Sequence, residues 1–172
     1  MGVHRYITWN GPAPTTAAQA SVTTGTTIKT MLQLATPSTR KIEVVSWGFG
    51  VDDPPGADAV IELLQTDAAA TVTAHVAAGV PPLDAGTPAS LLTLGVAATG
   101  YTATAEGAVT ATRVFEAVSL SSVSAEAAPV MAYTRQYLPN ERPIVDFSKF
   151  LCIRATTPTT AVDLRTWVIW EE

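Results

Sequence analysis

The chain has 172 residues, which is enough for one domain with a sizeable core. Only 15% of the residues are charged, the net charge is −5, and the ten lysines and arginines are scattered, so we expect no nucleic-acid partner. No stretch reaches the roughly eighteen apolar residues of a membrane span and no signal peptide is recognised, so we expect no membrane partner and synthesis in the cytoplasm.

Strand signals recur along the whole chain. Alanine and threonine make up about a third of the residues, and the branched threonine side chain suits a pleated strand. Apolar alternation is interrupted by turns rich in proline, glycine and threonine, and no helical period is sustained. The expected strands are 5–9, 27–34, 41–51, 59–66, 71–77, 108–118, 130–138, 144–147, 149–155 and 162–170. This pattern predicts an all-β fold, an antiparallel β-sandwich of jelly-roll type with eight to ten strands.

The remaining segments are expected to be irregular. Residues 12–26 consist mainly of Pro, Thr, Ala and Ser without a period, which predicts an extended arm. We therefore expect an N-terminal strand and arm over residues 1–26 and a single sandwich domain over residues 27–172. Long loops are expected over 79–92, with one helical turn starting at Ser90, and over 119–129, and no strand is expected in 95–107.

The stretch 41–51 carries apolar residues on both of its faces. The apolar positions switch parity between Val44 and Val45, which predicts a β-bulge at that point. Gly48 and Gly50 fall on the face opposite the aromatic residues of the stretch. Glycine at these positions would permit the close approach of another backbone.

The terminal strand, 162–170, raises the same question more strongly. Val168 and Trp170 point to one face, while Trp167 and Ile169 point to the other. A sandwich covers only one face of a strand, so the second face needs either a homo-oligomer or an added layer of the same chain, part of it supplied by the arm. We favour the oligomer. The expected interface residues are Tyr133, Tyr137, Trp167 and Trp170.

Residues 149–155 repeat this two-faced pattern, with Phe150 and Cys152 opposite Leu151 and Ile153. The single cysteine cannot form an intrachain disulfide and is expected to be a buried, small apolar side chain. The acidic pair Glu171–Glu172 follows the terminal strand and is expected to discourage edge pairing.

No motif in the chain carries catalytic chemistry. The two histidines and the cysteine are far apart, which predicts no metal site, and the nucleophile elbow, the dinucleotide fingerprint and the phosphate loop are missing. A glycosidase pair of carboxylates would have to come from Glu43, Glu62 or Glu116. We therefore expect no enzyme, no catalytic, cofactor-binding or metal-binding residue, and no cofactor; His75 is expected to be an ordinary exposed or hydrogen-bonded histidine.

A carbohydrate-binding module is the main alternative, because such modules are often β-sandwiches with exposed aromatic side chains. The candidates for a sugar contact are Trp9, Trp47, Tyr133 and Tyr137. The competing interpretation places Trp47 in the core and the two tyrosines in an interface, since aromatic residues are common in both places.

The combination of four stretches carries a resemblance to a known group of proteins. The stretches are TTGTTIKTMLQLATPSTRKIEVVSWGFGVD, ATVTAHVAAGV, ATGYTATAEGAVTATRVF and the closing WVIWEE. Together they resemble small capsid-decoration and minor structural proteins of tailed phages of actinobacteria. The resemblance implies a β-sandwich subunit, often trimeric, that sits on the outside of a mature head, reinforces it and has no active site.

From this resemblance we expect a virion protein on the capsid exterior, with a homotrimer and the major capsid protein as partners. A tail-associated or fibre-associated adhesion protein is the nearest variant. The N-terminal arm is the expected capsid-binding element, because unpatterned segments often become ordered on binding. The expected capsid contacts are Arg5, Tyr6 and Trp9.

Overall fold

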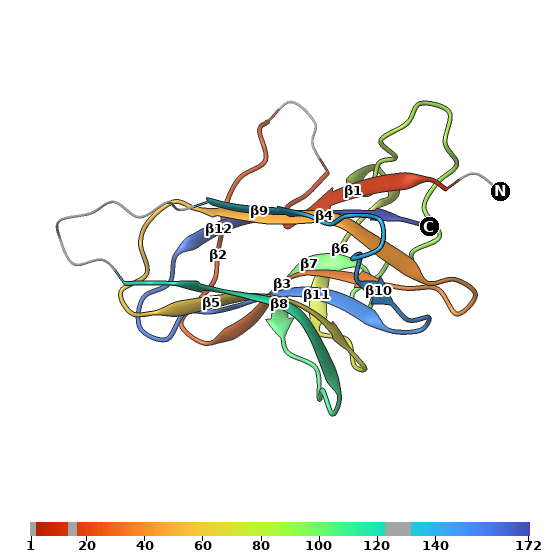
Figure 1. The fold of residues 1–172 in the computed structure, drawn as a ribbon. Coiled ribbons are helices and arrows are strands. Elements are labelled where there is room, and N and C mark those ends of the chain that lie inside the picture. Colours follow the sequence, from red (N-terminus) through yellow and green to blue (C-terminus); the bar gives the residue numbers. More distant parts are fainter. Residues whose placement is uncertain (1–2, 14–16, 123–131) are drawn as a thin grey trace.

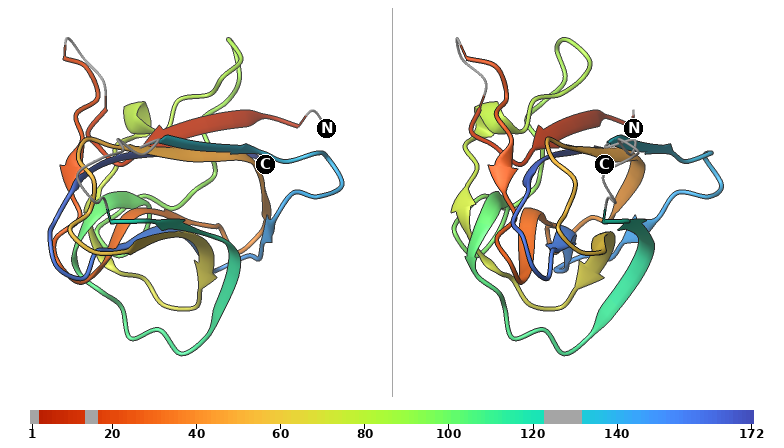
Figure 2. Two further views of the ribbon diagram at one scale, coloured as in Figure 1. Left: turned by 60° about the vertical axis from the view of Figure 1, so that its left-hand side comes forward. Right: turned by 90° about the vertical axis from the view of Figure 1, so that its left-hand side faces the viewer.

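The structure is a computed structural model that describes residues 3–13, 17–122 and 132–172 (Figure 1). Two antiparallel sheets of six strands each lie face to face, with one short 3₁₀ turn, η1 (Ala77–Gly79). Figure 2 shows the same two layers from two further sides. The predicted all-β sandwich is confirmed, although these residues form twelve strands where at most ten were expected. The jelly-roll type stays a prediction.

The first sheet, here called sheet A, is built around β12 (Asp163–Glu171). This strand lies between β1 (Arg5–Trp9) and β4 (Ile42–Val51), and the short β2 (Val22–Thr23) extends the β1 side of the sheet. The other edge of β4 is shared by β9 (Ala132–Gln136) and β10 (Ile144–Val145). The predicted arm 1–26 is therefore joined to the sandwich through two of its own segments.

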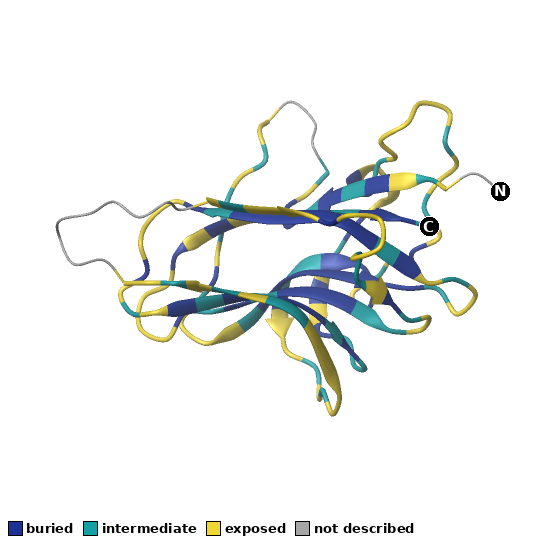
Figure 3. Cartoon of the chain, viewed as in Figure 1, coloured by how far each residue is buried: buried dark blue, intermediate teal, exposed yellow. Residues whose placement is uncertain are grey.

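The second sheet, sheet B, has a single continuous strand order. It runs β6 (Thr71–Ala74), β7 (Gly100–Ala105), β3 (Ile28–Ala35), β11 (Phe150–Thr156), β5 (Ala59–Thr66) and β8 (Thr112–Leu120). Buried residues recur along the strands of both sheets (Figure 3), and most of them form one apolar core cluster with members from each sheet. Trp47 and Trp170 are both 0% exposed, and the ring of Tyr6 stacks on Trp170 with 5.8 Å between the centroids.

The sequence missed β7, and the expectation of no strand in 95–107 was wrong. Gly100 of β7 lies so close to β6 that a Cβ atom added there would overlap the Thr73 carbonyl oxygen. Small residues show no apolar alternation from which a strand could be predicted, yet the close packing of β7 on β6 requires them. The helical turn expected at Ser90 is not formed, and a 3₁₀ turn is found at η1 instead. Residues 14–16 of the expected arm and residues 123–131 of the expected loop and strand lie outside the described residues.

The β-bulge predicted in 41–51 is confirmed. Ser46 pairs with Ile169, the next pair is Val44 with Trp170, and Val45 is left as the extra residue. The bulge lets the apolar positions on both sides of it face the core, although their parity in the sequence differs. For this reason β4 is buried along nearly its whole length.

An added layer from the same chain covers part of the outer face of sheet B. The fully buried Gln33 donates to the carbonyl oxygens of Ala98 (2.6 Å) and Ala70 (3.3 Å) and accepts from the Ala70 amide (2.8 Å). These bonds hold the segment after β5 and the segment before β7 against the sheet. Cys152 is 2% exposed next to Gln33, and burial raises its pKa to about 12. The expectation of a buried cysteine is confirmed.

The interpretation of Glu171 as protection for an edge strand was wrong, because β12 is central in sheet A. Glu171 accepts from Arg5 at 2.7 Å and also forms an ion pair with Arg142. Its side chain and that of Arg142 are nearly buried, at 10% and 12% exposed. The carboxylate therefore joins β1 and the segment before β10 to the end of β12.

His75 is buried, at 4% exposed, where three segments meet. Its Nε2 atom lies 3.0 Å from the Thr8 hydroxyl oxygen and 3.0 Å from the Trp9 carbonyl oxygen, while the Thr8 hydroxyl donates to the Gly79 carbonyl. Since that hydroxyl proton is used and a carbonyl only accepts, Nε2 carries the proton of the neutral ring. His75 thereby holds β1 to η1.

We predict that this histidine makes the stability of the protein depend on pH. Burial lowers the pKa of His75 below its ordinary 6.5, so near that pH the unfolded chain binds more protons than the folded one. The free energy of unfolding should therefore fall as the pH drops through about 6 towards the pKa of the folded protein. Urea unfolding at about pH 7.5 and about pH 5 measures this fall.

The variant His75→Gln should lose most of that fall, whereas His4→Gln, which changes the other histidine, should keep it. An equal fall in the His75→Gln protein would contradict the assignment.

Candidate functional site

The outer face of sheet A carries two apolar cross-strand pairs. Ile7 of β1 pairs with Ile169 of β12, and Trp9 pairs with Trp167. All four side chains are half-buried, and the two tryptophan rings lie 6.1 Å apart at 52°. We call these four residues, together with Arg165, the aromatic shelf.

Trp167 lies across β4 because that strand has no side chain beneath it. A Cβ atom at Gly48 would lie 2.7 Å from Cζ2 of Trp167 and 2.6 Å from the carbonyl oxygen of Tyr133. Gly48 thus admits both an aromatic ring and a neighbouring backbone, which confirms the role expected of it. The ring of Trp167 therefore lies against β4 at Gly48.

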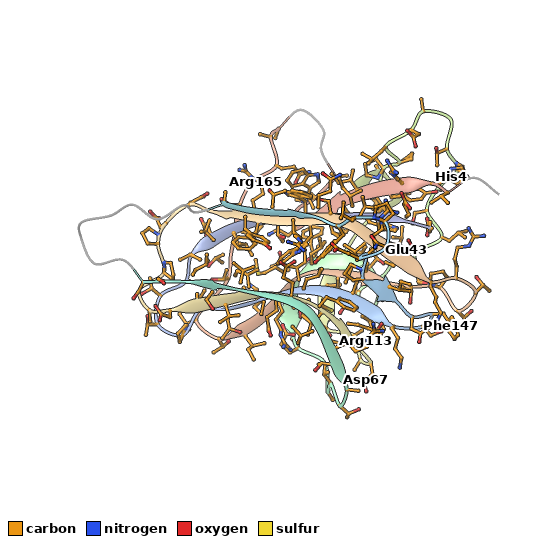
Figure 4. The ribbon with its side chains drawn as sticks, viewed as in Figure 1. His4, Glu43, Asp67, Arg113, Phe147 and Arg165 are labelled. Atoms are coloured by element: carbon orange, nitrogen blue, oxygen red, sulfur yellow. The ribbon has the colours of Figure 1, made fainter. Side chains whose placement is uncertain are left out.

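Arg165 stands beside Trp167 on the same face of β12. It pairs with Gly50 of β4, its side chain is exposed, and Figure 4 shows it on the outer side of sheet A. It forms no hydrogen bond or ion pair with the described residues. An exposed cationic side chain therefore lies next to the aromatic rings.

Two chain segments project on the same side as the shelf (Figure 1). The arm leaves sheet A at Asn10, whose side-chain amide donates to the Leu164 carbonyl and accepts from the Thr166 amide, both at 2.8 Å. The second projection lies within residues 76–96, called the apolar loop below. It is anchored on β1 by backbone bonds from Ile7 to Pro81 (3.1 Å) and from Leu83 to Arg5 (2.8 Å).

The apolar loop exposes an unusual amount of hydrophobic surface. Of the eleven large hydrophobic side chains that are exposed among the described residues, five belong to it. They are Val76, Leu83, Leu91, Leu94 and Val96, with 39% to 62% of each exposed. Cavities of about 220 Å³ and 190 Å³ open along the loop, the first against His4, Tyr6 and Arg40 and the second beside Val80, Pro82 and Leu94. This concentration of exposed apolar residues in one segment makes the segment a candidate contact surface for another molecule.

The tyrosines expected in an oligomer interface bind Glu116 of their own chain. The Glu116 carboxylate on β8 accepts from the hydroxyls of Tyr133 and Tyr137 (2.7 Å for Tyr137) and from the indole nitrogen of Trp47 at 2.9 Å. We call this group the Glu116 clasp. It connects the edge of sheet B to sheet A, and no local pattern in the sequence indicates it.

The clasp changes the titration of its members in opposite directions. Burial raises the pKa of Glu116, but the hydrogen bonds from Tyr133, Tyr137 and Trp47 outweigh burial and leave it below its ordinary value. Burial and the bond to Glu116 raise the pKa of Tyr133 to about 12, and that of Tyr137 is raised by the same causes. The carboxylate is therefore ionised and the phenols are neutral at neutral pH.

The structure places the other predicted contact residues in different surroundings. Trp170 and Tyr6 are 0% and 1% exposed inside the sandwich, so their rings are covered by their own chain and present no surface to a neighbour. Arg5 is about half exposed and bound to Glu171. Trp9 and Trp167, predicted for two different contacts, lie together on the aromatic shelf.

The candidate carboxylates do not form a catalytic pair. Glu62 binds Arg154 at 2.9 Å on the outer face of sheet B, whereas Glu116 faces sheet A. Glu43 lies on sheet A and is 3.8 Å from Arg142. Among the residues that the structure describes, no three His, Cys, Asp or Glu side chains gather where they could hold a metal ion.

Comparisons of the chain with protein-family models, with curated proteins and with solved structures gave no match. In the described part of the chain, no helix has the length and apolar character needed to cross a membrane.

We predict that Glu116→Ala destabilises the protein by about 2–3 kcal/mol, because it leaves two phenols and an indole N–H without their acceptor. Urea unfolding measures the change, and Glu141→Ala, at an exposed position, is the control. A loss within about 0.5 kcal/mol of the control would contradict a structural role for the clasp.

Proposed function

We propose that this chain is a non-enzymatic structural protein of a virion, a decoration protein that binds the outside of a tailed-phage capsid. The observation that carries the proposal is the apolar loop, which exposes five large hydrophobic side chains within one segment of the chain. Such a surface is costly in water and is stabilised when another protein covers it. The proposal also agrees with the resemblance of the sequence to phage decoration proteins.

In this proposal the apolar loop contacts the major capsid protein. The loop is anchored on β1, so Arg5 and Tyr6 support the loop and do not contact the capsid themselves. The Arg5 carbonyl accepts a hydrogen bond from the Leu83 amide, and the Tyr6 hydroxyl donates to the Pro88 carbonyl at 3.0 Å. A homotrimer would present three such loops at once. Linked weak contacts then act at a high effective concentration, which suits a protein that reinforces a repeating lattice.

The contact is tested by placing charge on the loop. The double variant Leu83→Asp/Leu91→Asp should lower the affinity for purified capsids at least about tenfold, because two carboxylates would have to be desolvated in the contact. Co-sedimentation with capsids measures the affinity. Leu138→Asp is the matched control, since Leu138 is 61% exposed but lies outside the loop. Equal binding of both variants would refute the assigned surface.

The oligomeric state is tested by light scattering after gel filtration. We expect a mass close to three times the 18.0 kDa of one chain. A monomeric mass for the unaltered protein at micromolar concentration would refute the predicted trimer.

A carbohydrate-binding or adhesion module is the second candidate function. It is favoured by the partly exposed pair Trp9 and Trp167, which is separate from the apolar loop. Trp47, Tyr133 and Tyr137 do not support it, because Trp47 lies in the core and both tyrosine hydroxyls are bound to Glu116.

A further inference from the structure

The ring of Trp167 is partly exposed and is already held in place. Gly48 and the backbone of β4 lie beneath it, and Trp9 stands beside it at 52°. A ring fixed in this way offers a flat apolar surface, and little conformational entropy is lost when a ligand stacks on it. The C–H face of a pyranose sugar has the matching shape and polarity.

Arg165 supplies a charge at a suitable distance from this ring. It lies two residues before Trp167 on the same face, which places the two Cα atoms about 6.6 Å apart along the strand. Its exposed guanidinium has no partner among the described residues, although the whole chain is acidic with a net charge of −5. Asp163 lies two residues before Arg165 on the same face of β12, so Arg165 stands between that carboxylate and the Trp167 ring. A guanidinium fork binds a carboxylate through two hydrogen bonds.

Uncharged polar side chains lie on the other side of the ring. Thr134 of β9 pairs with Gly48, directly across from Trp167, and Gln136 is two residues further on; both are exposed. A hydroxyl and an amide each donate and accept hydrogen bonds, which matches the hydroxyl groups around a sugar.

We propose that the aromatic shelf binds an acidic sugar, a hexuronate unit of a polysaccharide, with its ring on Trp167 and its carboxylate on Arg165. Parts of the arm and of the apolar loop rise on the same side as the shelf (Figure 1). This inference rests on the second candidate function and names its ligand class.

Affinity electrophoresis in gels containing polygalacturonate tests the site, with a dextran gel as the neutral comparison. The unaltered protein should be retarded by polygalacturonate and much less by dextran. Trp167→Ala and Arg165→Gln should each weaken the retardation at least tenfold. Arg113→Gln is the matched control, because Arg113 is an exposed arginine on sheet B, and it should behave as the unaltered protein.

Fluorescence titration with a trigalacturonate provides a second measurement, because Trp9 and Trp167 are partly exposed while Trp47 and Trp170 are buried. Arg165→Gln changes an exposed side chain and keeps the fold, so its result stands even if Trp167→Ala is unstable.

No retardation of the unaltered protein would overturn the inference, as would retardation that Arg165→Gln leaves unchanged. The variant Leu83→Asp/Leu91→Asp should keep sugar binding, so a failure of the capsid contact and a failure of the sugar site remain distinguishable.

Discussion

The position of β12 in the middle of sheet A is the constraint on which the rest of the structure depends. This strand separates β1 from β4 and pairs with both, so two of the longest ladders of sheet A pass through it. A central strand has two faces to fill. The inner face supplies Val168 and Trp170 to the core, and the outer face supplies Trp167 and Ile169 to the shelf.

Polar side chains connect the parts that the apolar core does not hold. The Gln33 amide fastens a loop over the outer face of sheet B, the Asn10 amide continues the β12 ladder where β1 ends, and the Glu116 clasp links the edges of the two sheets. Each of these groups is satisfied by several hydrogen bonds, which is the condition under which a buried polar group specifies a fold instead of weakening it.

The sequence predicted those features that depend on local pattern. The strands around Trp9, Trp47 and Trp167 follow from apolar alternation, and the bulge at Val45 follows from one change of parity. The strand at Gly100 was missed because close backbone packing there demands residues that carry no pattern.

The candidate sites depended on information that the sequence does not hold. Trp9 and Trp167 were assigned to separate contacts, since nothing local shows that the two strands are neighbours. The same holds for Tyr137 and Glu116, whose bond crosses from one sheet to the other. The covering layer over Cys152 was weighed as an alternative, but it comes from the segment after β5 and not from the arm.

The pairing of β1 with β12 also sets the order in which the protein can fold. Arg5 and Glu171 are 166 residues apart, so sheet A stays incomplete until β12 has left the ribosome. Until then Tyr6, Trp47 and Phe49 lack the strand that covers them, and β4 has an open edge. Contacts between residues so far apart in the sequence cost loop-closure entropy before any contact energy is gained, which slows folding. In the meantime the incomplete sheet is exposed to pairing with a second chain. A sheet whose central strand is made after both of its neighbours thus depends on a low local concentration of the chain, or on being sheltered until that strand has joined.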